Sequence, residues 1–352
     1  MNAAARFLLV LLVLILPVGL LRAQEPAAAP GATVSVPAAD LMGGASMLES
    51  CADCGCAGGG WAAGVGLYWM QPYFENNLAY AVGQTNAGPP VSLTVGRVDV
   101  SHHMEVAPLV WLGYVSDCGW GARARWWYFR QGTSQTEPAG TAGATLTSAA
   151  PLGLSLTGGG AALNVTTKLE LQAADLEATQ DYRVGSWDFL LAAGVRLARV
   201  TQSYNAYFDR GGLNELLSGH GFQGVGPTLA LEARRPFGAS GLALIGNARG
   251  SVVFGSARQR AEVPDLNSIA TDHRNRGLPI AELELGLEYA RTIGAGRVFG
   301  QVGFVGQDWF GAGGASRSSL NVAPGGAVNG AAYVGDSDIS LLGVSFRLGL
   351  DY

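Results

Sequence analysis

The chain ends in a stretch of unbroken alternation, Ser340–Tyr352, which reads SLLGVSFRLGLDY. Large apolar side chains occupy every second position, and small or charged residues such as Arg347 fill the positions between them. Successive side chains of a β-strand point to opposite faces, so this strand has one apolar and one polar face. The pattern fits the edge of a soluble sandwich, or the closing strand of an outer-membrane barrel with lipid outside and a lumen inside.

Nine further alternating segments precede this one, at about 61–69, 104–114, 120–128, 167–178, 187–197, 225–233, 242–254, 281–289 and 298–304. The connections between the ten segments are long and short in strict turn. Outer-membrane barrels have long external loops, tight periplasmic turns and an even number of strands. The sequence therefore predicts an all-β, antiparallel up-and-down transmembrane barrel of about ten strands. The count becomes 12 if the long segments 73–102 or 201–219 hide a hairpin.

The N-terminal region predicts export. Residues 7–21 form the only long apolar run, preceded by Arg6 and followed by a small-residue cleavage site that ends at Ala23. We expect a signal peptide over 1–23, a flexible Ala/Gly/Pro-rich periplasmic leader over 24–60 and the barrel over 61–352. The formal charge of −5 makes an exported chain of this kind a poor candidate for binding nucleic acid.

The ionisable residues of the predicted strands share one face, opposite the apolar side chains. A charge on the lipid face would cost about 2–4 kcal/mol at mid-membrane for Arg or Lys, which places this face toward the lumen. One phase change, near Ala173-Ala174, predicts a β-bulge. The expected lumen-facing residues are Arg123, Arg125, Lys168, Glu170, Glu177, Asp188, Arg196, Glu232, Arg249, Glu282, Glu284, Glu288 and Arg347.

Three segments resemble the Legionella major outer membrane protein-like family of pore-forming proteins. They are GYVSDCGWGARARWWYF (113–129), KLELQAADLEATQDYRVGSWDFLLAAGVRLARV (168–200) and GFQGVGPTLALEARRPFGASGLALIGNARGSVVFG (221–255). The resemblance covers most of 61–352 and implies an outer-membrane barrel with pore activity. It implies no catalytic residue, and it does not extend to the cysteine cluster or the loops.

The four cysteines are Cys51, Cys54, Cys56 and Cys118. An even number in an exported chain predicts disulfides, for which three pairings are possible. Bonds between chains and a zinc site of four thiolates are the alternatives.

The four histidines fall at the long-loop rim. His102, His103, His220 and His273, with Asp99 or Asp272, could form a surface hydrolase site, and the alternative is four unrelated loop residues. The chain has no GxSxG or HExxH motif.

The leading functional hypothesis is a porin-like barrel for passive diffusion of small hydrophilic solutes or ions, with no reaction and no cofactor. A plugged structural or adhesive barrel that acts through its loops is the alternative, because ten strands lie close to the eight that side chains fill. The expected partners are outer-membrane lipid, the permeating solutes and, as a homo-oligomer, further copies of the chain.

Overall fold

The computed structural model describes residues 59–352, except 76, 87–91, 118, 140–143, 210–214, 265–266, 317–319, 323–327 and 331–336. The predicted signal peptide, nearly all of the predicted leader and all four cysteines lie outside the described residues. The boundaries at 23 and 60 and the disulfides therefore stay predictions. None of the described residues forms a helix long and apolar enough to cross a bilayer.

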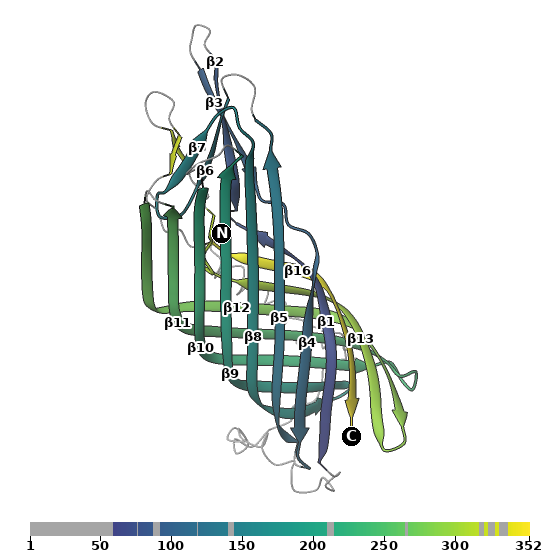
Figure 1. The fold of residues 1–352 in the computed structure, drawn as a ribbon. Helices are drawn as coiled ribbons and strands as arrows, with labels where there is room; N and C mark the ends of the chain where they lie inside the picture. The colour runs from purple at the N-terminus through teal and green to yellow at the C-terminus, as the bar shows by residue number, and fades with distance from the viewer. Residues whose placement is uncertain are drawn as a thin grey trace, which may run out of the picture. The chain divides into compact units, whose positions relative to one another are not determined.

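Ten strands form a closed barrel in the order β1-β16-β13-β12-β11-β10-β9-β8-β5-β4 (Figure 1). All neighbours pair antiparallel, which confirms the predicted fold class. The barrel strands are β1 (Gly60–Phe74), β4 (Glu105–Val115), β5 (Trp120–Glu137), β8 (Leu163–Val184), β9 (Trp187–Phe208), β10 (Glu215–Pro236), β11 (Leu242–Val263), β12 (Asn267–Ile293), β13 (Gly296–Trp309) and β16 (Ile339–Asp351).

The last strand closes the barrel, as its alternation suggests. Arg347 pairs in register with Gly66 on β1 and with Gln301 on β13. At the opposite end from the long connections, two-residue turns join β8 to β9 and β12 to β13. Gly185 and Gly294 adopt φ values of 61° and 63° in these turns, a conformation that glycine reaches without strain.

The predicted long loops contain β-structure. Segment 73–102 does hide a hairpin, but β2 (Leu78–Asn86) and β3 (Ser92–Asp99) lie outside the barrel. They join β6 (Ala144–Ala149) and β7 (Ser155–Gly158) in a four-stranded sheet of order β3-β2-β6-β7 (Figure 1). The short strands β14 (Leu320–Val322) and β15 (Val328–Gly330) pair with each other. The barrel therefore keeps ten strands.

The barrel strands are also longer than their alternating segments. Strands β8 to β11 each have 22 residues, whereas about 9–11 cross a bilayer. The segment 201–219, expected to be a long connection, is mostly strand, because β9 continues to Phe208 and β10 begins at Glu215.

The barrel wall changes its polarity partway along each long strand, and β9 shows this most clearly. Outward residues Val195 and Leu197 are apolar and exposed, whereas the next outward residue is Arg199. Inward, the order is reversed, because Arg196 is followed by the buried Ala198 and Val200. The pairing register does not shift at this point, so only the chemistry changes. The lower part of the barrel, toward the short turns, therefore has an apolar exterior and a charged interior. The upper part, toward the long connections, has a polar exterior and an apolar interior.

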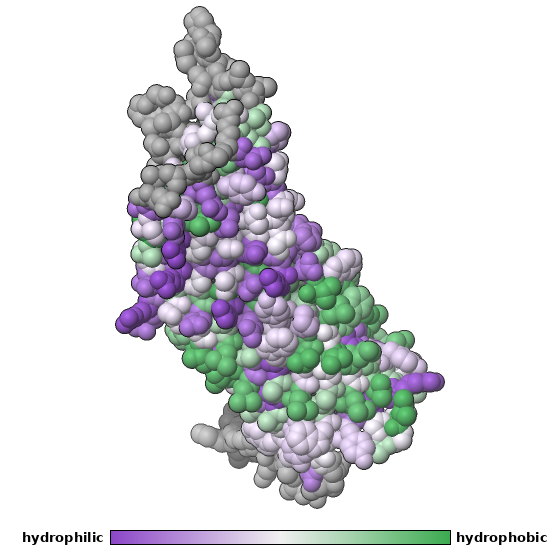
Figure 2. All heavy atoms as spheres, in the orientation of Figure 1, coloured by the Kyte–Doolittle hydropathy of each residue, from purple (hydrophilic) through white to green (hydrophobic). Residues whose placement is uncertain are grey.

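This exterior apolar surface forms a band. Figure 2 shows apolar residues gathered over the lower part of the visible face, with hydrophilic residues above them. Exposed aromatics mark both limits, with Trp69 toward the long connections, and Trp120 and Tyr289 toward the turns. Such girdles occur at the two interfaces of outer-membrane barrels.

Candidate functional site: the charged barrel interior

Inward-facing ion pairs fill the part of the barrel that carries the apolar band. Arg196 on β9 is fully buried, and its Nε and Nη2 lie 2.6 and 2.9 Å from the two carboxylate oxygens of Asp175 on β8. Arg125 on β5 lies 3.1 Å from Asp175 Oδ2 and 3.0 Å from Glu282 Oε2 on β12. Arg196 also contacts Glu282, at 2.5 Å. Two arginines thus share two carboxylates, drawn from four strands.

A second group lies beside the first. Arg123 on β5 contacts Glu177 at 2.9 Å and Glu232 on β10 at 2.7 Å. Arg249 on β11 also binds Glu177, and it lies 3.6 Å from Asp175 and 3.9 Å from Glu232. Because Arg249 reaches carboxylates of both groups, the ion pairs form one continuous network.

The network continues to the closing strand. Arg347 on β16 binds Glu284, and Ser345 Oγ donates to the same carboxylate at 2.6 Å. The Tyr68 hydroxyl accepts from Arg347 at 3.1 Å and from Arg125 at 2.8 Å. Tyr68 therefore bridges this group to the central one.

Charge balance and burial decide what this network can do. Five arginines meet five carboxylates, and the side chains are 0–14% exposed except for Glu232 at 28%. Removing an ion from water costs several kcal/mol, and only close partners offset that cost. Each buried arginine has carboxylate partners, so the charges neutralise one another across the lumen. The members of the network are Arg123, Arg125, Arg196, Arg249, Arg347, Asp175, Glu177, Glu232, Glu282 and Glu284.

An aromatic layer lies directly above the network. Trp127 and Trp309 are both fully buried, with ring centroids 6.0 Å apart in an edge-to-face arrangement. Tyr68 meets Trp127 edge-to-face at 6.3 Å, so one tyrosine belongs to both layers. Phe129 and Met70 extend the same core. The interior above the charges is therefore a packed hydrophobic core.

Toward the turns the interior is more open. Arg234 lies 3.1 Å from Asp188 and 2.7 Å from Glu288, and Arg297 lies 2.6 Å from Asp351. The side chains of Arg234 and Arg297 are 29% and 31% exposed. The charged side chains at this end of the barrel are therefore partly exposed to solvent.

Eleven of the thirteen residues expected in the lumen face the interior. They are Arg123, Arg125, Glu177, Asp188, Arg196, Glu232, Arg249, Glu282, Glu284, Glu288 and Arg347. All of them take part in ion pairs. These residues therefore make the barrel interior charged at this level. That they line a path for solutes stays a prediction.

The structure places Lys168 and Glu170 on the outer face, contrary to the expectation. The predicted bulge near Ala173-Ala174 is absent, because β8 pairs without a register shift with both β5 and β9. Lys168 is exposed, and Glu170 lies 3.3 Å from the outward Arg130. Both residues lie above the polarity change, where the interior side of β8 carries buried Leu169 and Leu171.

Sequence reasoning missed two central members of the site. Asp175 shares its face with Glu177 two positions later, but the local pattern does not show that it contacts three arginines of other strands. Tyr68 follows the expected alternation of β1, but nothing in the sequence near it indicates that its hydroxyl joins two arginines from distant strands.

The histidines do not converge on one site. His102 contacts Gln131 and Asn77, His103 lies 3.4 Å from Glu105, and His220 lies 2.9 Å from Gln259. His273 is exposed on β12. The two aspartates of the hydrolase hypothesis, Asp99 and Asp272, contact Arg97 and Arg258. Among the described residues, no three His, Cys, Asp or Glu side chains are grouped so as to hold a metal ion.

His102 lies in a polar network outside the membrane band. Its Nδ1 lies 2.7 Å from Gln131 Oε1, its Nε2 lies 2.7 Å from Asn77 Nδ2, and its ring stacks on Phe74. One nitrogen thus donates and the other accepts, which requires the neutral ring. Burial lowers the pKa of His102; the Gln131 hydrogen bond opposes this and nearby His103 adds to it.

We expect this histidine to make the loop before β4 sensitive to acid. The pKa of His102 is lower in the folded chain, so the unfolded chain binds the proton first. The free energy needed to open this loop therefore falls as the pH drops below about 6.5, the pKa of an unfolded histidine. Hydrogen exchange of residues 99–104 at about pH 7.5 and about pH 5.5 measures this. His102→Gln should remove most of the difference and His103→Gln should retain it. Equal protection at both pH values in the wild type contradicts the prediction.

A closed ten-stranded barrel with an apolar outer band, two aromatic girdles and a charged interior defines an outer-membrane β-barrel protein. The chain belongs to the family of the Legionella pneumophila major outer membrane protein precursor, which matches residues 54–351. Its place is accordingly the outer membrane, where lipid surrounds the band.

No curated protein sequence matches the chain. Solved structures with a distant likeness include the outer membrane protease OmpT from Escherichia coli, at 9% identity, covering 83% of this chain and 96% of that chain, with a TM-score of 0.42. A Pseudomonas aeruginosa FadL homologue has 8% identity, coverage of 84% and 90%, and a TM-score of 0.25. The Pseudomonas putida toluene transporter TodX has 9% identity, coverage of 83% and 89%, and a TM-score of 0.23. These likenesses are too distant to carry an argument about activity.

Proposed function

We propose that this protein is a closed outer-membrane barrel that acts through the β-structure it carries beyond the membrane. The observation that supports this most directly is the burial of Arg196 between Asp175 and Glu282 at the level of the band. The aromatic layer of Trp127 and Trp309 then fills the next level. An ion that crossed would have to displace a charge-balanced ion-pair network and pass a hydrophobic core, and both steps are unfavourable.

The part beyond the band is built like a domain. Tyr80 on β2 donates to Glu137 at 2.6 Å, and a second apolar core joins the four-stranded sheet to the upper barrel strands. Leu163, Tyr204 and Leu216 are fully buried in this core. By the rule that outer-membrane barrels keep their short turns in the periplasm, this structure faces the cell exterior. A folded surface of this kind suits recognition or adhesion.

Planar-bilayer conductance of the purified, folded protein tests the proposal. We expect no discrete conductance steps, because buried ion pairs and the aromatic layer occupy two successive levels of the described interior. Heat-modifiable migration on gels and protection from protease in liposomes would establish that the silent protein is folded and inserted. Discrete, reproducible steps of one size would overturn the closed barrel.

The second candidate is the porin-like pore for small hydrophilic solutes or ions. The partial exposure of Arg234 and Arg297 to solvent favours it, as does the family resemblance. If the wild type conducts, the double variant Arg123→Ala/Arg125→Ala should shift selectivity toward cations, because it leaves Glu177 and Glu282 without these counter-charges. A reversal potential that does not change would remove these arginines from the conduction path.

A further inference from the structure

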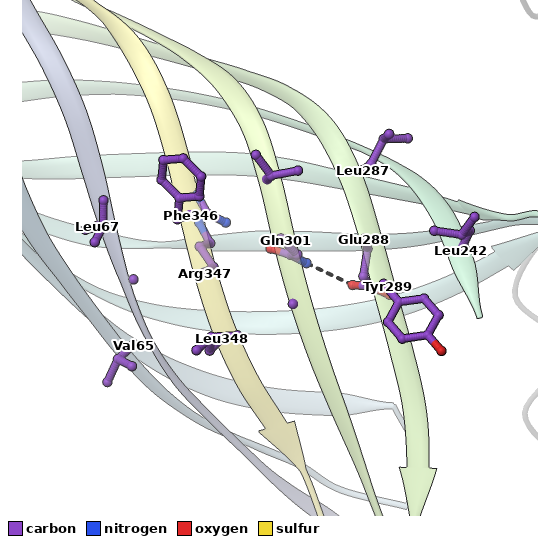
Figure 3. Close-up of a pocket in the computed structure, with 13 residues that line it drawn as sticks. Val65, Leu67, Leu242, Leu287, Glu288, Tyr289, Gln301, Phe346, Arg347 and Leu348 are labelled. Carbon is purple, nitrogen blue, oxygen red and sulfur yellow. Dashed lines mark hydrogen bonds between the residues drawn. The ribbon is translucent and has the colours of Figure 1, made fainter.

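The outer face of the barrel has an apolar groove near its turn end, with a volume of about 640 Å³ (Figure 3). Five strands line it, β1, β16, β13, β12 and β11, and most of the lining surface is apolar. The lining also includes Glu288, Gln301 and Arg347, whose side chains belong to the inward face of their strands. The outward apolar side chains that border it are Val65, Leu67, Leu242, Leu287, Tyr289, Val302, Phe346 and Leu348.

Strand register explains why a groove exists there. Gly300 on β13 pairs with Tyr289 on one side and with Leu348 on the other. Leu242 and Val65 extend the same cross-strand row on β11 and β1. Gly300 is the one position of this row without a side chain, so the row has a gap where its neighbours stand out from the wall.

A cation lies at the turn side of the gap. Arg291 follows Tyr289 by two residues on the outward face of β12, about 7 Å further toward the turn at 3.4 Å per residue. It is exposed and pairs in register with Val298, next to Gly300 on the outward face of β13. Among the described residues it has no carboxylate partner, unlike the inward Arg297 on the neighbouring strand.

We propose that this groove holds one acyl chain of a glycerophospholipid from the periplasm-facing leaflet, with the lipid phosphate at Arg291. The groove lies within the band, where hydrocarbon is the surrounding solvent. Arg291 lies on the turn side of the groove, toward the interface, where it offers the charge that a phosphodiester needs. The gap is one side chain wide, which suits a chain of methylenes better than the broad complementary surface of a second copy.

The variant Gly300→Leu should fill the groove and leave the fold intact. A Cβ at Gly300 would meet Leu348 Cδ2 at 3.4 Å and nothing closer, so a leucine fits into the gap. Gly306→Leu is the matched control, because Gly306 is outward on the same strand and its Cβ would meet Leu342 Cδ2 at 3.3 Å. Leu342 and Gly306 do not line the groove.

Native mass spectrometry of protein purified from outer membranes, titrated with 1-palmitoyl-2-oleoyl phosphatidylglycerol, gives the readout. We expect the wild type and Gly306→Leu to retain one lipid, and Gly300→Leu to lose it. Equal retention by Gly300→Leu, or equal loss by Gly306→Leu, overturns the site. A protein dimer that Gly300→Leu dissociates would identify a second copy as the occupant and also overturn the proposal.

The role of Arg291 is tested separately. Arg291→Gln should weaken phosphatidylglycerol binding about fivefold, the factor for roughly one interfacial cation. The neutral diacylglycerol with the same two chains should bind the wild type and Arg291→Gln equally, because it has no phosphate. If Arg291→Gln leaves phosphatidylglycerol binding unchanged, Arg291 is not part of the site.

Discussion

Replacing Arg196 by methionine is expected to destabilise the barrel by about 3–5 kcal/mol, the cost of removing one partner from a buried ion-pair network. Methionine keeps much of the volume but leaves Arg125 as the arginine that contacts both Asp175 and Glu282. The measurement is the free energy of unfolding by guanidinium chloride in detergent, followed by tryptophan fluorescence.

Two further variants show whether the charge is the cause. Arg130→Ala removes an outward ion pair with Glu170, whose side chains are 61% and 37% exposed, and should cost no more than about 1 kcal/mol. Adding Asp175→Asn and Glu282→Gln to Arg196→Met should recover part of the lost stability, because the buried carboxylates no longer lack a counter-charge. A loss under about 1 kcal/mol for Arg196→Met would mean that water already solvates this level, and would favour the pore.

Replacing Trp127 by alanine is expected to cost about 3–5 kcal/mol, as for large core side chains elsewhere. The ring is fully buried between Tyr68 and Trp309, and its loss leaves a cavity that the rigid wall cannot close. The adjacent Trp126 is the matched control, because it faces outward and stacks on Tyr128. Trp126→Ala should cost clearly less under the same conditions.

This pair of variants distinguishes a packed interior from a channel wall. In a water-filled lumen an inward tryptophan would be no more important than an outward one. Equal losses for Trp127→Ala and Trp126→Ala would therefore contradict the aromatic layer. A conductance that appears only in Trp127→Ala would identify the layer as the barrier.

The sequence was most informative within the membrane band. There the alternation of Val195, Arg196 and Leu197 determines which side chains face outward, because lipid excludes charge from the outer face. Above the band the exterior is water, so polar residues face outward and apolar residues pack inside, the reverse of the arrangement within the band. The assignment of Lys168 and Glu170 to the lumen failed there, because nothing local marks the level at which the solvent changes.

From the sequence alone we could predict an antiparallel barrel of about ten strands and the closing role of Ser340–Tyr352, because strand period and connection length are local properties. The choice between ten and 12 strands needed the structure, in which the hairpin of 73–102 lies outside the barrel. The tertiary structure was needed to show which carboxylate meets which arginine. Asp175 and Glu282 lie far apart in the chain, yet Arg125 and Arg196 join them across the barrel. Contacts across the lumen depend on closure of the whole sheet, and no local pattern encodes that distance.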